Sequence, residues 1–69
     1  MVEIEQIRNR LAEAIKHCGL TQTELAKRLG VSQPTVANYL RGKILPALDT
    51  FANLCIILDI DANDILGEE

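Results

Sequence analysis

The chain has 69 residues, 48% of them hydrophobic, and a formal net charge of −3. This length accommodates one small domain, residues 1–69, and excludes a second. The longest apolar run, residues 54–58, is far shorter than the 20 or so residues of a membrane-spanning helix. The first fifteen residues also lack the basic and then apolar pattern of a secretory signal, so we expect a cytoplasmic protein with no membrane partner.

Charge is distributed unevenly along the chain. Residues 1–43 hold all seven Lys and Arg against four Glu, a balance of +3, whereas residues 44–69 hold six acidic residues and no basic one. An anionic partner needs a locally positive surface rather than a positive total. The net charge of −3 therefore does not exclude binding to nucleic acid.

Apolar spacing predicts helices in the first half of the chain. Apolar residues recur every three or four positions from about Glu3 to His17, which is typical of an amphipathic helix. A second helix should follow Thr21, an N-cap whose capping box is closed by Glu24. It should end at Gly30, which can adopt the left-handed conformation of a helix C-terminus.

Three further helices are predicted after this turn. The third is capped by Ser32, carries Pro34 in its first turn and ends at Gly42. The fourth covers about 48–58, and a brief fifth, capped at Asp61, ends before residue 67. The side chains expected to face the core from the fourth helix are Leu48, Phe51, Leu54, Cys55 and Leu58. Because no segment shows strand alternation, the predicted fold is an all-α domain of five short helices.

Few residues are suited to catalysis or metal binding. The single histidine, His17, could join Cys18 and Cys55 in at most three ligands, one fewer than structural zinc requires. The only serine, Ser32, is better explained as a helix cap, and the residues around Lys43 lack the pattern of a phosphate-binding loop. We therefore expect that the protein is not an enzyme and that it binds no metal, no cofactor and no small-molecule ligand. His17 should be exposed and both thiols buried.

Residues 22–41 carry the strongest indication of function. Two helices of about eight residues, joined by a tight turn, must cross steeply and leave the second helix projecting. At 100° per residue, Val36, Tyr39 and Leu40 form its buried side. The outward and flanking positions of the same helix carry Gln33, Pro34, Thr35, Ala37, Asn38 and Arg41. Amides can pair with adenine, Arg with guanine or phosphate, and methyl groups with thymine. A polar outward face is common, however, and is weak evidence alone.

The spacing of this segment is more specific. Residues 20–33 read LTQTELAKRLGVSQ and closely resemble the helix-turn-helix of the phage repressor and Cro family, also called the xenobiotic response element family. The likeness continues through residues 41–43, Pro46 and residues 60–66. It implies a five-helix, lambda-repressor-like domain with its helix-turn-helix at residues 21–41, whose third helix enters the major groove of double-stranded DNA.

The resemblance also implies roles for individual residues. The positions that match base readers, primary and secondary, are Gln33, Pro34, Thr35, Ala37 and Asn38. The positions that match phosphate contacts are Gln22, Arg41 and Lys43. Pro34 departs from the family, because many relatives carry a hydrogen-bonding side chain there, so one base is expected to be read by shape or methyl contact. The acidic C-terminal third should face away from the DNA.

Isoleucines that lie off the inward side of the fourth helix predict a homodimer. Ile57 points almost opposite to the inward side, and Ile56 lies to its flank. Isolated exposed apolar residues are common. The more specific hypothesis is a two-fold contact that buries Ile57 together with Ile56, Ile60 and Ile65, and places two recognition helices about 34 Å apart.

These inferences predict a sequence-specific DNA-binding transcription regulator, in the simplest case a repressor that occupies its operator. The alternative is a protein-interaction module of the same fold, such as an antitoxin or an adaptor, which the negative net charge favours. The initial Met1 and the acidic end at Glu68 and Glu69 are typical of a complete small protein. The DNA-binding part of a longer repressor is the other possibility.

Overall fold

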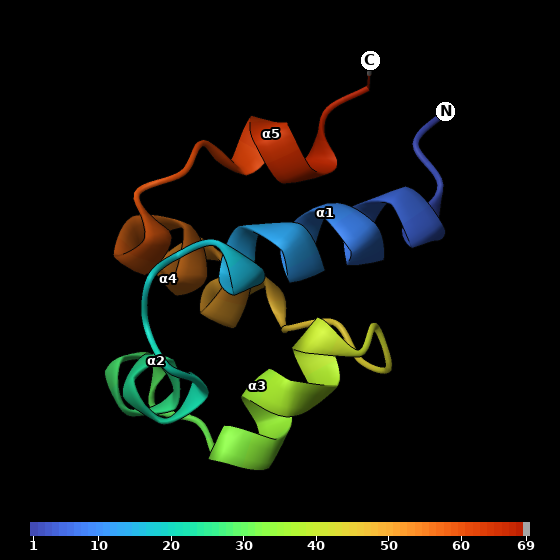
Figure 1. Ribbon diagram of the computed structural model, residues 1–69. Coiled ribbons are helices and arrows are strands. Elements are labelled where there is room, and N and C mark those ends of the chain that lie inside the picture. The colour runs from blue at the N-terminus through green and yellow to red at the C-terminus, as the bar shows by residue number, and fades with distance from the viewer. Residues whose placement is uncertain (69) are drawn as a thin grey trace.

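The computed structural model describes residues 1–68, and the last residue of the predicted domain, Glu69, lies outside the described residues. The described chain forms five α-helices and no strand, which confirms the predicted class (Figure 1). The helices are α1 (Ile4–Lys16), α2 (Gln22–Leu29), α3 (Gln33–Leu40), α4 (Leu48–Leu58) and α5 (Ala62–Leu66). None of these five is both long and apolar enough to cross a membrane.

The predicted helix ends are present. The Thr21 hydroxyl accepts a hydrogen bond from the Glu24 amide at 3.1 Å, and the Thr21 amide donates to the Glu24 carboxylate at 3.4 Å. The Asp61 carboxylate likewise accepts from the Asn63 amide at 2.9 Å. Gly30 ends α2 with φ of +77°, a left-handed conformation that glycine adopts without strain. These local interactions explain why the helix boundaries follow the sequence signals.

The cap of α2 gives a first prediction. Thr21→Ala removes the acceptor for the Glu24 amide and should lower the free energy of unfolding by about 1 kcal/mol. Urea denaturation followed by circular dichroism measures this change. Thr23→Ala, in the first turn of the same helix, is the matched control and should cost less. An equal loss in the two variants would contradict the assigned cap.

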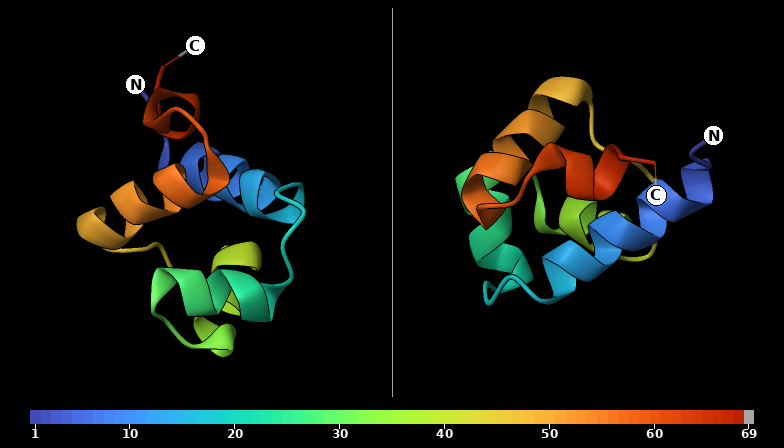
Figure 2. Two further views of the ribbon diagram at one scale, coloured as in Figure 1. Left: turned by 90° about the vertical axis from the view of Figure 1, so that its left-hand side faces the viewer. Right: turned by 90° about the horizontal axis from the view of Figure 1, so that it is seen from above.

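Side chains from all five helices meet in one core. They are Leu11, Ile15, Leu25, Ala26, Val36, Tyr39, Phe51, Leu54, Cys55 and Ile65. Helix α1 runs through the middle of the molecule, with α5 on one side and α2 and α3 on the other (Figures 1 and 2). The core therefore fixes α2 and α3 together at one end of the molecule.

Helix α5 and both described ends of the chain lie opposite α3 (Figure 2). The Arg10 guanidinium of α1 donates to the main-chain carbonyls of Ile65 at 3.1 Å and Gly67 at 2.6 Å. The amino group of Met1 contacts the Glu68 carboxylate at 2.7 Å. The Arg10 contacts tie the end of α5 to α1, so α5, which carries Asp64, lies away from α3. Helix α4, unlike α5, packs along α2, the partner helix of α3.

Several side chains are less buried than their spacing predicts. Leu48, expected to face the core, is 84% exposed, and Leu40, Leu58 and Cys18 are half-buried. Helical periodicity gives the direction of a side chain around the axis, but it does not show whether a neighbouring element lies at that height. Leu48 is the first residue of α4, and there its direction meets no covering element. The predicted burial of Val36 and Tyr39 is confirmed.

Candidate nucleic-acid interface

The turn between α2 and α3 sets the position of the candidate recognition helix. The amides of Gly30 and Val31 both donate to the Ala26 carbonyl, at 2.9 and 3.0 Å, and so reverse the chain within a few residues. Val36 and Tyr39 then anchor α3 in the core. The sides of α3 that do not face the core lie at the lower end of the molecule in Figure 1.

The predicted base readers all lie on α3 outside the core. Gln33 and Pro34 are exposed, and Thr35, Ala37 and Asn38 are half-buried. The helix contains no acidic residue. Its accessible side therefore offers amide donors, amide acceptors and methyl groups without a carboxylate to repel phosphate. These are the groups that read base edges in a major groove.

A hydrogen bond that spacing does not predict joins two of the predicted DNA-binding residues. The Gln33 side-chain amide donates to the Gln22 side-chain carbonyl at 2.5 Å. Each glutamine is the first residue of its helix, α2 or α3, so the pair links the two N-terminal ends. The contact uses the Gln22 carbonyl and one N–H of the Gln33 amide, so the Gln22 amide N–H groups and the Gln33 carbonyl remain available for other hydrogen bonds. Because the partners are eleven residues apart on different helices, no local pattern predicts the pair.

The hydroxyl group of Thr35 is engaged in the start of α3. It lies 2.8 Å from the Ser32 hydroxyl, which also accepts from the Thr35 amide at 3.3 Å. A base contact through this hydroxyl would compete with the helix cap. The methyl group of Thr35 is therefore the better candidate for a base contact.

Positive charge follows directly after α3. Arg41 and Lys43 are exposed, and the Lys43 amide donates to the Asn38 carbonyl at 3.0 Å, which folds the chain back against the helix end. Gly42 lies between them with φ of +70°, and a Cβ atom added there would lie 3.8 Å from the Cβ atom of Arg8, so α1 passes close to this turn. The guanidinium of Arg8 contacts Glu5 at 3.5 Å. Spacing did not predict this neighbour.

The surroundings of His17 and Cys55 are typical of structural residues. His17 is exposed, as predicted, and contacts Glu13 at 3.6 Å. Burial raises the pKa of the Cys55 thiol, and the negative charge of Asp61 adds to that effect. The thiol therefore stays protonated at neutral pH, as expected of a buried apolar residue. Across residues 1–68, no three side chains of His, Cys, Asp or Glu converge as metal ligands would.

The predicted dimer residues occupy three different environments. Ile56 is 76% exposed, whereas Ile57 and Ile60 are half-buried against the core. Ile65 is 3% exposed, so its assignment to an interface is corrected: its side chain is already buried within the subunit. Both Ile60 and Ile65 sit closer to the core than expected because α5 folds back onto α1.

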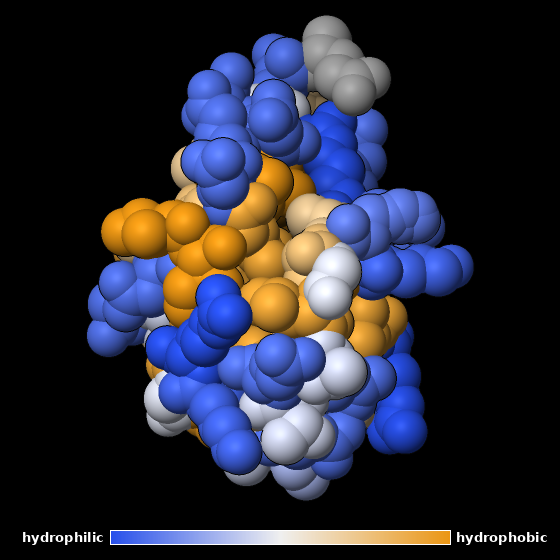
Figure 3. Space-filling model, turned by 60° about the vertical axis from the view of Figure 1, so that its left-hand side comes forward, coloured by the Kyte–Doolittle hydropathy of each residue, from blue (hydrophilic) through white to orange (hydrophobic). Residues whose placement is uncertain are grey.

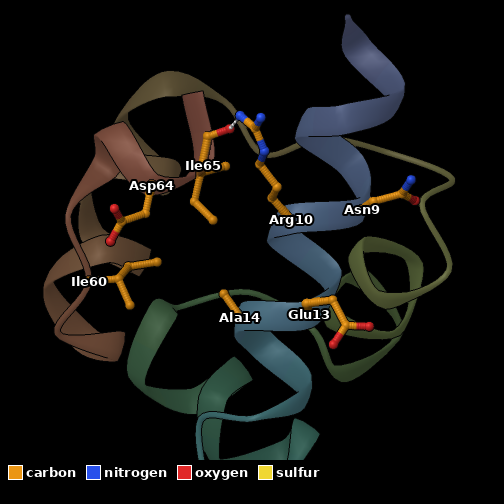
Figure 4. A pocket seen from close by; sticks show the side chains of 7 residues that line it. All are labelled: Asn9, Arg10, Glu13, Ala14, Ile60, Asp64 and Ile65. Atoms are coloured by element: carbon orange, nitrogen blue, oxygen red, sulfur yellow. Dashed lines mark hydrogen bonds between the residues drawn. The ribbon is translucent and has the colours of Figure 1, made fainter. Parts of the chain in front are cut away.

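An apolar hollow lies on the side of α1 that faces α5. A band of apolar surface crosses the middle of the face shown in Figure 3, between polar regions above and below. Between α1 and α5, Ala14, Ile60 and Ile65 line a hollow of about 400 Å³ (Figure 4). Charged side chains of Arg10 and Asp64 stand beside it. This hollow is separate from α3.

Two short helices joined by a tight turn that contains glycine form a helix-turn-helix. Helices α2 and α3 have this arrangement. A family model described as helix-turn-helix matches residues 11–65. The chain therefore belongs to the helix-turn-helix family, of the phage repressor and Cro type that the sequence resembles. This family is a DNA-binding regulatory domain.

Several curated proteins are similar to this chain. Antitoxin HigA1 of Mycobacterium tuberculosis (strain CDC 1551 / Oshkosh) is 43% identical over an alignment of 54 residues that covers 72% of this chain and 36% of that protein. The ImmF control region 10 kDa protein of Bacillus phage phi105 is 36% identical over 44 residues, covering 64% of this chain and 49% of that protein. Stage 0 sporulation protein J of Bacillus subtilis (strain 168) is 59% identical over 32 residues, 46% of this chain and 11% of that protein. The chain thus spans less than half of each of these relatives. The search of solved structures found no significant match to this chain.

Proposed function

We propose that this protein is a sequence-specific transcription regulator that represses by occupying a double-stranded DNA operator, with α3 in the major groove. The supporting observation is the accessible side of α3, which carries Gln33 and Asn38 without an acidic residue. Arg41 and Lys43 add positive charge at the end of the same helix. Side-chain amides flanked by cations are suited to bases flanked by phosphates.

The proposed contacts divide into two classes. Gln33, Pro34 and Asn38, with Ala37 and the methyl group of Thr35, contact base edges. Gln22, Arg41 and Lys43 contact phosphates, where the start of α2 contributes its helix dipole at Gln22. The regulator acts in the cytoplasm, on the nucleoid, as a homodimer that covers two half-sites.

A salt series on random duplex DNA tests the proposal. Binding with three to six phosphate contacts per subunit should give a log–log slope of about −3 to −5 per subunit. Lys43→Ala should make the slope shallower by about 1 and weaken binding to all sequences alike. Asp64→Asn, which changes the net charge by one unit on α5, is the control and should leave the slope unchanged. A parent slope near zero would contradict DNA binding.

The alternative function is a protein-interaction module. The similarity to antitoxin HigA1 supports it, since the name antitoxin indicates a protein that counteracts a toxin. The apolar hollow between α1 and α5 offers a surface for such a partner on the side away from α3. A flat salt response would favour this alternative over operator binding.

A further inference from the structure

A second hollow, of about 300 Å³, lies between the end of α1 and the start of α2. The polar side chains that line it are those of Lys16, Thr21 and Gln22, and apolar side chains complete the lining. None of the lining residues is acidic. Lys16 therefore contributes the one charge among the residues that line this hollow.

The charge of Lys16 is not neutralised by an ion pair in the described part of the chain. Lys16 is exposed in the last turn of α1. Glu13, three residues before it on the same helix, contacts His17 instead, at 3.6 Å. The Glu24 carboxylate accepts from the Thr21 amide at 3.4 Å and from the Thr21 hydroxyl at 3.2 Å, which holds it in the cap of α2. The Lys16 ammonium is thus available to an anion at the hollow.

The hollow adjoins the proposed DNA-binding surface. Gln22, which lines it, is hydrogen-bonded to Gln33 at the start of α3. Leu40, in the last turn of α3, lines it as well. A group bound at the hollow therefore lies beside α3, whereas α5 lies at the opposite end of the molecule (Figure 2).

Gln22 is the one proposed phosphate contact that carries no charge. The two cations among the proposed contacts, Arg41 and Lys43, both follow α3. A neutral donor positions a phosphate but neutralises none of its charge, and charge neutralisation dominates affinity for DNA. Lys16 supplies a cation at the hollow that Gln22 lines, on a flexible four-carbon stem.

We propose that Lys16 is a further phosphate contact and that it acts together with Gln22 on one phosphate of the DNA. This phosphate accepts hydrogen bonds from the Lys16 ammonium and from a Gln22 side-chain N–H group, which the bond to Gln33 leaves available. The inference rests on the proposed function and deepens it, because it adds a binding residue on α1, outside the helix-turn-helix itself.

A salt series on random duplex DNA tests the role of Lys16. Lys16→Gln should make the log–log slope shallower by about 0.9 and weaken binding by about 5- to 10-fold at about 0.1 M salt. Lys16→Arg keeps the charge and should retain the parent slope. Lys27→Gln removes the same charge from an exposed position on α2 that does not line the hollow. It is the matched control and should leave the slope unchanged.

Ethylation interference on an operator selected from a random pool tests whether Lys16 and Gln22 share a phosphate. Ethylation removes the charge of one phosphate at a time, so it should weaken the parent where a contact is lost. Lys16→Gln and Gln22→Ala should each lose sensitivity to ethylation at the same phosphate. Loss of sensitivity at two different phosphates would contradict the shared contact.

The slope separates a DNA contact from a structural role. A cation in the last turn of α1 also interacts favourably with the helix dipole. If Lys16→Gln lowers stability but keeps the parent slope, Lys16 contacts no phosphate and the inference is wrong. A parent slope near zero would instead refute the proposed function, so the two failures are distinguishable.

Discussion

Leu54→Ala is expected to lower the free energy of unfolding by about 2–5 kcal/mol. Leu54 is 0% exposed and is among the largest fully buried side chains of the described core. Its truncation removes buried methyl groups and leaves a cavity where α4 meets the rest of the core. A domain of this length has a total stability of only about 3–10 kcal/mol, so the loss is a large share of it.

Urea denaturation monitored by circular dichroism measures this loss. Asn53→Ala, the exposed neighbour on α4, is the control and should leave stability unchanged or slightly higher, because Ala has the better helix propensity. A change below about 1 kcal/mol in Leu54→Ala would contradict the close packing of this core.

Asn38→Ala should weaken binding to the cognate operator by about 1–3 kcal/mol, or about 5-fold to 150-fold. The side-chain amide is the part of Asn38 that can read adenine, whereas its main-chain carbonyl, which accepts from Lys43, is retained. The binding assay uses operators selected from a random duplex pool, with random DNA as the comparison.

The comparison between operator and random DNA shows whether Asn38 reads a base. Asn38→Ala should leave affinity for random DNA nearly unchanged, whereas Lys43→Ala should weaken binding to the operator and to random DNA to the same degree. If the Asn38 variant binds the selected operator as well as the parent does, this residue is not a base reader.

Much of the fold is predictable from the sequence because its signals are local. The Thr21 and Glu24 box, the Ser32 cap and the left-handed Gly30 each depend on residues within one turn of one another. The third helix was also placed correctly, because Val36 and Tyr39 are spaced to face a partner helix. The family likeness adds the expectation that this helix contacts DNA.

The surfaces between helices were less predictable. Spacing predicts Leu48 in the core and Ile65 at an interface, but Leu48 is exposed and Ile65 is buried within the subunit. Those positions depend on how far a neighbouring helix extends, which no periodicity records. The contact between Gln22 and Gln33 was missed for the same reason, since it forms only when two helix ends meet in space.

The placement of α5 opposite α3 also bears on how the protein would meet DNA. Asp61 and Asp64 lie at the start of α5 and in its first turn, whereas the exposed cations Arg41 and Lys43 follow α3 at the opposite end of the molecule. If α3 enters the DNA as proposed, this separation of charge should help to turn α3 toward the duplex before contact. The association rate should then fall with ionic strength even in variants whose final contacts are intact.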